Sequence, residues 1–244
     1  MKIILKKLIR FISWNFFEAY FIQKKFNLID EYKKDTLRES FLYFKEHFNK
    51  SILFRTSKSL KSSYSIELFK YSVNKIGNEI LNKGLYLEFG TYRGDSAKII
   101  SNILSYKSSL KLYTFDSFDG LSEDWLGSEK PSGTFKLNQI PKLPKNCEII
   151  KGNIYETLKP FLLKHNSKIS FIHCDVDTYE ITKFVLEECK NFLNNKSVII
   201  FDDLHNRAGW KNGQIKALEE TIDKDAYKYI AFSESGQAAI LIEK

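Results

Sequence analysis

The spacing of hydrophobic and polar positions changes near residue 84. Before it, apolar residues recur every three or four positions, which predicts helices over residues 1–80. After it, short β-prone runs alternate with helical stretches. The predicted strands are 85–89, 111–115, a strand beginning at 148–150, 169–174 and 197–201, and the predicted helices are 95–104, 155–163, 178–192 and 213–222. This alternation predicts a parallel sheet with helices on both faces.

The end of the chain has a different pattern. Residues 227–232 and 237–242 form two β-prone runs joined by a Ser-Glu-Ser-Gly turn, which predicts an antiparallel hairpin. The expected fold is therefore α/β and Rossmann-like, with a mostly parallel seven-stranded sheet that ends in this hairpin. We expect two parts, an N-terminal helical extension over residues 1–80 and an α/β domain over residues 81–244.

A glycine-containing turn follows the first predicted strand, with the sequence Glu88-Phe-Gly90-Thr91-Tyr92-Arg-Gly94. The glycines allow a tight turn and close approach to a ligand, and the next helix begins with unpaired N–H groups. The spacing differs from the dinucleotide fingerprint G-x-G-x-x-G. The acidic residue before the turn suits an ammonium better than a phosphate. We predict a cofactor site here, with a structural glycine turn as the alternative.

Two further strand ends carry residues suited to a nucleoside. Asp116 ends the second predicted strand, where a carboxylate can accept both ribose hydroxyls, and Ser117 follows it. Asn153 and Ile154 follow the third strand, where an amide or a backbone N–H can meet an adenine edge. The alternatives are a turn role for Asp116 and an N-cap role for Asn153, and the N-cap role is compatible with binding.

Acidic residues follow the fourth and fifth predicted strands, as Asp175-Val-Asp177 and Asp202-Asp203. Adjacent parallel strands direct such residues into one cleft at the carboxyl edge of the sheet. Converging carboxylates repel and raise each other's pKa values unless a cation lies between them. We therefore predict a divalent ion with oxygen ligands, Mg²⁺ ahead of Mn²⁺ or Ca²⁺. For Asp177, the N-cap of the next helix is the favoured interpretation.

Two histidines lie close to these acids in the sequence. His173 shares a strand face with Asp175, and a packing role is its main interpretation. His205 follows the acidic pair and is a candidate substrate contact, with a structural role as the alternative.

The composition limits the classes of protein. The chain has 244 residues, 43% hydrophobic and 15% aromatic, which suits one α/β domain with an appendage and excludes a disordered chain. The net charge of +8 comes from scattered residues, mostly lysine, so no nucleic-acid partner is expected. The cysteines at 147, 174 and 189 form no C-x-x-C motif, which indicates free thiols in a reducing compartment.

The N-terminal segment is expected to form an amphipathic helix. Apolar residues at 4, 5, 8, 11, 12 and 16 recur at helical spacing, and charges at 6, 7, 10 and 18 interrupt any signal-peptide core or membrane span. Such a helix can pack on the domain or a partner subunit, or lie on a membrane surface. We expect a cytoplasmic homo-oligomer, with peripheral contact at the inner membrane surface as the alternative.

The motifs, in this order, resemble the macrocin O-methyltransferase family. The matching stretches include LEFGTYRGDSA, YTFDSFDGL, the run from 141 to 162, ISFIHCDVDTYEITKFVLEEC and IIFDDLHNRAGWKNGQIKALEE, and they span about residues 84–222. An antiparallel C-terminal hairpin is also typical of class I methyltransferases. The resemblance implies Mg²⁺- and S-adenosylmethionine-dependent methyl transfer to a sugar hydroxyl. The first 80 residues match nothing in the family.

The resemblance also implies roles for individual positions. Asp175, Asp202 and Asp203 resemble the metal ligands, and Asp175 also resembles the general base. Residues 119–144 resemble a mobile lid, in which Trp125 and Phe135 can stack on a sugar or only close the lid against the core. With the motif neighbours, the predicted cofactor contacts are Glu88, Gly90, Thr91, Tyr92, Asp116, Ser117, Asn153, Ile154 and Asp175.

The predicted function is O-methylation of a sugar in a surface glycan or a secondary-metabolite glycoside. A small catechol-like phenol is an alternative acceptor, because vicinal hydroxyls would also suit Mg²⁺. A non-enzymatic RNA-binding or assembly module that retains the fold is a second alternative, although the intact acidic set argues against lost catalysis. An NAD-type oxidoreductase is disfavoured by the glycine spacing.

Overall fold

The computed structural model describes residues 28, 30–55, 64–106 and 110–243. The amphipathic helix predicted near the N-terminus lies outside these residues. Among the described residues, no helix is both long enough and apolar enough to cross a membrane.

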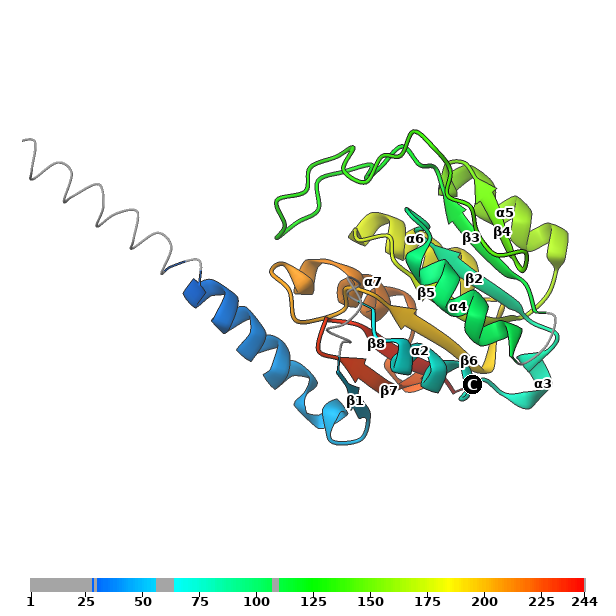
Figure 1. Ribbon diagram of the computed structural model, residues 1–244. Helices are drawn as coiled ribbons and strands as arrows, with labels where there is room; N and C mark the ends of the chain where they lie inside the picture. The colour runs from blue at the N-terminus through cyan, green and yellow to red at the C-terminus, as the bar shows by residue number, and fades with distance from the viewer. Residues whose placement is uncertain (1–27, 29, 56–63, 107–109, 244) are drawn as a thin grey trace, which may run out of the picture.

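An eight-stranded sheet forms the centre of the molecule, with the strand order β1-β7-β8-β6-β5-β2-β3-β4 (Figure 1). Only β8 runs antiparallel to its neighbours, β6 and β7. The parallel sheet and its C-terminal hairpin were both predicted from the sequence. The strands are β1 (Ile52–Phe54), β2 (Leu85–Phe89), β3 (Leu112–Asp116), β4 (Cys147–Lys151), β5 (Ile169–Cys174), β6 (Leu193–Phe201), β7 (Tyr227–Ser233) and β8 (Ala238–Ile242).

The eighth strand, β1, differs from the sequence prediction of seven. It lies at positions that were predicted to be helical, and its three residues pair in parallel with β7, with Leu53 opposite Phe232. The helix that follows, α2 (Ile66–Val73), buries Leu68 and Phe69 against the sheet. β1 therefore belongs to the central sheet, and α2 packs on that sheet.

Helices cover both faces of the sheet (Figure 1). On one face, α2, α3 (Asn78–Leu81) and α4 (Asp95–Ser105) enclose a core that includes Phe69, Ile100 and Val198. On the other face, α5 (Ile154–His165), α6 (Tyr179–Cys189) and α7 (Gln214–Thr221) enclose a core that includes Val185 and Leu218. Each such side chain contributes about 1.5–3 kcal/mol on full burial, so this packing fixes the strand ends.

An N-terminal helix over residues 30–48 projects from the domain (Figure 1). Its covered side chains recur every fourth residue, which is one face of a helix. They are Thr36, Ser40, Phe44 and, in part, Phe48. Phe44 is fully buried, and its ring centroid lies 5.7 Å from that of Trp210 and 5.5 Å from that of Phe232. The helix is thus anchored to the domain near its C-terminal end.

Residues 117–146, between β3 and β4, contain no helix or strand in their described conformation. The segment folds back on itself, because Trp125 N–H donates to the carbonyl of Lys130 (3.0 Å) and Leu121 N–H donates to that of Thr134 (2.8 Å). Arg207 Nη2 donates to the carbonyl of Leu126 (3.0 Å). The predicted lid is therefore tethered to the loop that follows β6.

Candidate active site at the carboxyl edge of the sheet

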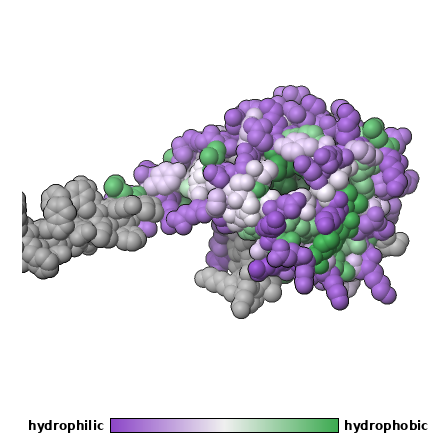
Figure 2. Space-filling model, turned by 90° about the horizontal axis from the view of Figure 1, so that it is seen from above, coloured by the Kyte–Doolittle hydropathy of each residue, from purple (hydrophilic) through white to green (hydrophobic). Residues whose placement is uncertain are grey.

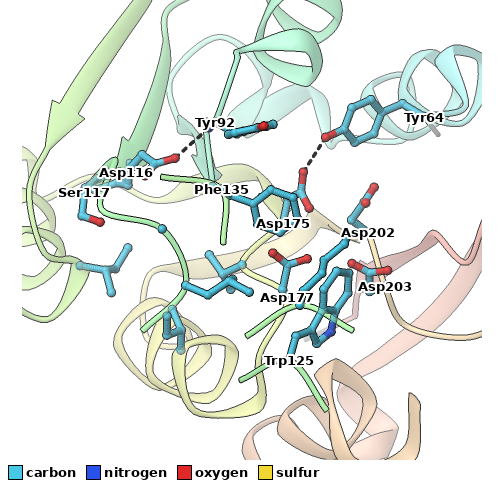
Figure 3. A pocket seen from close by; sticks show the side chains of 18 of the residues that line it. Tyr64, Tyr92, Asp116, Ser117, Trp125, Phe135, Asp175, Asp177, Asp202 and Asp203 are labelled. Atoms are coloured by element: carbon cyan, nitrogen blue, oxygen red, sulfur yellow. Dashed lines mark hydrogen bonds between the residues drawn. The ribbon is translucent and has the colours of Figure 1, made fainter. Parts of the chain in front are cut away.

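One cavity of about 420 Å³ lies where β2, β3, β5 and β6 end, with the β3–β4 segment along its other side. Figure 3 shows its labelled side chains, and Figure 2 shows a mostly hydrophilic surface in which hydrophobic residues appear at the bottom of a hollow. The lining includes Tyr64, Gly90, Tyr92, Phe115, Asp116, Ser117, Leu121, Trp125, Lys130, Phe135, Gly152, Ile154, Asp175, Val176, Asp177, Ile181, Asp202, Asp203 and Ser235. The volume suits a small-molecule ligand.

Four aspartates gather in this cavity (Figure 3). Ligand atoms of Asp175, Asp177 and Asp203 lie within 4.8 Å of one another, and a second group of the same span joins Asp175 and Asp202 to His173. Burial and the charge of Asp202 raise the pKa values of Asp175 and Asp203 well above their usual range. The same two causes raise the pKa of Asp177 to about 6.

This donor set fits a hard divalent cation. The side chains of Asp202 and Asp203 are only 13% and 16% exposed, so water screens their charges poorly. Carboxylate oxygens are the preferred ligands of Mg²⁺. A cation bound there would remove the repulsion that raises the pKa values. The predicted ligands Asp175, Asp202 and Asp203 all line the cavity, and Asp175 is common to the two groups of ligand atoms, one with Asp202 and the other with Asp203.

Asp177 differs from the sequence prediction. The N-cap of α6 is Thr178, so the favoured N-cap interpretation of Asp177 was wrong. Asp177 has φ 63° and its side chain lines the cavity beside Asp203. Its position two residues after Asp175, beyond a buried strand, was the signal available in the sequence.

Side chains from distant segments hold two of these acids. Tyr64 Oη donates to Asp175 Oδ2 (2.7 Å), and Gln237 Nε2 donates to Asp202 Oδ1 (2.6 Å). Neither donor was among the predicted site residues, because nothing local in the sequence marks them.

Glu88 is fully buried and is absent from the cavity lining. Its Oε1 lies 3.1 Å from His173 Nδ1, and its Oε2 accepts a hydrogen bond from Thr114 Oγ1 (2.8 Å). Burial lowers the pKa of His173, but Asp202, Glu88 and Asp175 together raise it to about 10. His173 is fully buried on β5, which agrees with the predicted packing role. A contact between Glu88 and a cofactor ammonium would need a bridging group.

The turn after β2 is fixed by Asp116. Its Oδ2 accepts from the backbone N–H groups of Thr91 (2.9 Å) and Tyr92 (2.8 Å), and its Oδ1 accepts from that of Phe118 (2.7 Å). A carboxylate offers about four acceptor sites, so capacity for one ribose hydroxyl remains without breaking these bonds. Asp116 thus has the turn role that was the alternative interpretation, and it still faces the cavity.

Gly90 is required for a close approach to another strand end. It has φ +91°, and a Cβ there would lie 1.9 Å from the backbone oxygen of Asp175. A glycine at this position therefore lets the β2 turn pack directly on the backbone of the proposed base.

The other predicted cofactor residues divide into two groups. Tyr92, Ser117 and Ile154 line the cavity. Asn153 instead caps α5, where its side chain accepts from Tyr155 N–H (3.0 Å), and it is absent from the lining. Thr91 is buried against Thr114. Gly90, Asp116, Gly152 and apolar residues such as Ile154 give this end of the cavity the polar and apolar surfaces that a nucleoside needs.

The predicted substrate aromatics Trp125 and Phe135 both line the cavity. The ammonium of Lys130 lies 4.4 Å from the Trp125 ring centroid and 4.6 Å from that of Phe135. The Arg207 guanidinium lies 4.4 Å from the Trp125 ring. Trp125 thus interacts with two cations and is available to a ligand only where they leave its surface open.

His205 is in a different place from the one predicted. It is 1% exposed, lies outside the cavity lining, and contacts the rings of Phe44 (5.7 Å) and Phe232 (5.4 Å). Burial lowers its pKa. The candidate substrate role of His205 is therefore wrong in this structure, because the N-terminal helix encloses the ring.

Comparisons with known proteins agree with this geometry. Residues 87–204 match the model of a methyltransferase domain. Among solved structures, the chain is similar to the calicheamicin methyltransferase CalS11 (TM-score 0.59, 19% identity, 72% of this chain and 76% of that one). It is also similar to the O-methyltransferase NovP (TM-score 0.56, 17% identity, 73% and 79%). No curated protein matches the sequence.

The matched domain, the sheet order and the cavity at the strand ends define the class. The chain is a methyltransferase with a Rossmann-like fold, of the kind that uses S-adenosylmethionine. The predicted fold class and enzyme class are thereby confirmed. Membership of the macrocin family in particular stays a prediction.

Proposed function

We propose that the protein transfers a methyl group from S-adenosylmethionine to a hydroxyl of a sugar, with Mg²⁺ held by Asp175, Asp202 and Asp203. The observation that carries the proposal is the partly buried acidic cluster at the strand ends, in the same cavity as the β2 turn and Asp116. Asp177 is within reach of the same cation.

Different residues of the cavity have different roles in the proposed reaction. Gly90, Asp116 and Ile154 bind and orient the nucleoside and methionine parts of the donor. Asp175 accepts the proton of the attacking hydroxyl, because it contacts the β2 turn on one side and shares a ligand group with Asp202 on the other. A bound divalent cation would supply Lewis-acid lowering of the hydroxyl pKa. Trp125 and Phe135 exclude water and position the acceptor.

A sugar acceptor is favoured by the aromatic wall and by two cationic side chains, Lys130 and Arg207, beside it. Aromatic faces suit the apolar C–H surface of a sugar ring, and cations suit its oxygen atoms or a phosphate. CalS11, which has the same fold, is described as a TDP-rhamnose 3'-O-methyltransferase. Nucleotide sugars are therefore the first acceptors to test, followed by glycosides and catechol-like phenols.

The decisive experiment measures transfer of a labelled methyl group to this acceptor panel with and without Mg²⁺. We expect methylated sugar only with a divalent cation, and loss of turnover on addition of EDTA. Asp202→Asn and Asp203→Asn should each abolish the metal-dependent turnover while S-adenosylhomocysteine still binds, as measured by calorimetry. Full activity in EDTA would refute the metal assignment, and methylation of phenols alone would refute the sugar assignment.

The cytoplasmic location, the homo-oligomer and the peripheral membrane contact stay proposals. Size-exclusion chromatography with light scattering, and flotation with anionic vesicles, test the last two directly.

A further inference from the structure

Tyr64 lies immediately before α2 and reaches into the acidic end of the cavity (Figure 3). Its Oη donates to Asp175 Oδ2 at 2.7 Å. Its ring meets the edge of His173 (centroids 6.0 Å apart) and lies 6.2 Å from Phe69. A phenolic hydroxyl can donate and a carboxylate can only accept, so Tyr64 is the donor of this hydrogen bond.

The backbone beside Tyr64 is tied to a second acid of the cluster. Ser65 N–H donates to Gln237 Oε1 (2.9 Å), and Nε2 of the same amide donates to Asp202 Oδ1 (2.6 Å). Ser65 also caps α2, because its Oγ accepts from Leu68 N–H (3.4 Å). The start of α2 thus contacts the acid after β5 through Tyr64 and the acid after β6 through Gln237.

We infer that Tyr64 is a positioning residue that fixes the carboxylate of Asp175. The inference rests on the proposed function of Asp175 as metal ligand and base. The terminal torsion of an aspartate is broad, so a free carboxylate exchanges its two oxygens between orientations. A charge-assisted hydrogen bond to Oδ2 removes that freedom and leaves Oδ1 for the cation or the acceptor proton.

The matched pair of variants is Tyr64→Phe and Tyr71→Phe. Both remove one phenolic oxygen from the α2 region, but Tyr71 packs its ring against Phe54 and Lys75 and lies outside the cavity lining. Residues that orient metal ligands typically change metal affinity or activity by about 10–100-fold. We expect Tyr64→Phe to weaken Mg²⁺ binding by about tenfold in calorimetry and to lower kcat by a similar factor. The affinity for S-adenosylhomocysteine and the melting temperature should follow those of Tyr71→Phe.

A double-mutant cycle tests whether Tyr64 acts through Asp175. In an Asp175→Asn background, Tyr64→Phe should cause no further loss of Mg²⁺ affinity, because the group that it orients has been neutralised. A further tenfold loss in that background would overturn the inference. Equal Mg²⁺ affinity and equal kcat in the two Phe variants would also overturn it.

The outcomes separate this inference from the proposed function. If Asp175→Asn weakens Mg²⁺ binding and Tyr64→Phe does not, the metal site stands and the positioning role of Tyr64 is wrong. If wild-type protein binds no Mg²⁺ and its turnover survives EDTA, the metal assignment is wrong, and the inference, which rests on it, falls as well.

Discussion

Gly90→Ala is the substitution whose consequence follows most directly from the geometry. An added Cβ would stand 1.9 Å from the backbone oxygen of Asp175 and 2.8 Å from its carbonyl carbon. Real Cβ atoms essentially never approach other atoms within 3.0 Å, so the β2 turn and the end of β5 must separate by about 1.1 Å. The obstacle is backbone, which cannot rotate away as a flexible side chain can.

The expected loss in the free energy of unfolding has two causes. Overpacking of this kind costs about 1–3 kcal/mol, and a non-glycine residue at φ +91° costs about 1–2 kcal/mol more. The expected loss in the free energy of unfolding is therefore about 2–5 kcal/mol. A displacement of about 1 Å at a reacting group can lower a rate by about 100-fold, so residual turnover should be at most about 1%.

Gly133→Ala is the matched control. Gly133 also has positive φ (+83°), but a Cβ there would meet nothing within 4 Å. Urea denaturation and methyl transfer at saturating donor should be measured for both variants. The control should lose only the backbone cost of about 1–2 kcal/mol. If Gly90→Ala matched Gly133→Ala in both stability and rate, the proposed contact between the β2 turn and Asp175 would be wrong.

Three further predictions concern single residues of the cavity. Asp116→Ala should lower the free energy of unfolding by about 2–4 kcal/mol, because three backbone N–H groups lose their acceptor. It should also weaken S-adenosylhomocysteine binding at least about tenfold. Unchanged affinity would contradict the proposed contact between Asp116 and the ribose. Trp125→Ala should raise the KM for the acceptor by about tenfold or more and leave cofactor affinity unchanged, and a reversed pattern would place the indole on the donor. The pKa of Asp177 is about 6 in the folded, metal-free protein and 3.8 in the unfolded chain, so the folded state binds the proton more tightly. This contribution to stability is complete below about pH 4 and is lost as the pH rises through 6. The melting temperature should therefore fall over this window more in wild-type protein than in Asp177→Asn, and equal slopes would contradict this.

The main elements were predictable because their patterns are local. The bounds of β2 and β5 match the prediction, since a continuous apolar run bounded by polar turns is typical of a buried parallel strand. The placement of Asp175, Asp202 and Asp203 in one cavity was also predictable, because parallel strands all end at the same edge of the sheet.

The differences arise where long-range contacts decide the outcome. β1 has three residues, and its pairing with β7 joins Leu53 to Phe232, so no local period marks it. His205 is enclosed by Phe44, which belongs to a helix more than 150 positions earlier in the chain. The backbone of Asp177 itself is in the left-handed region (φ 63°), and hydrophobic periodicity does not predict such a conformation. Tyr64 was missed for the same reason, since its partner is known only once the sheet is assembled.

Asp175 is where these local and long-range effects combine. Its backbone position depends on Gly90 in β2, and its side-chain orientation depends on Tyr64 before α2. In the metal-free protein, burial and the nearby charge of Asp202 raise its pKa, and a bound cation would lower it again. An ordinary carboxylate and an alcohol differ by roughly ten pKa units, so the proposed mechanism needs the cation to lower the pKa of the hydroxyl. Without a cation, the repulsion between these carboxylates would destabilise the fold. The proposed metal site would offset the electrostatic cost of keeping four aspartates together.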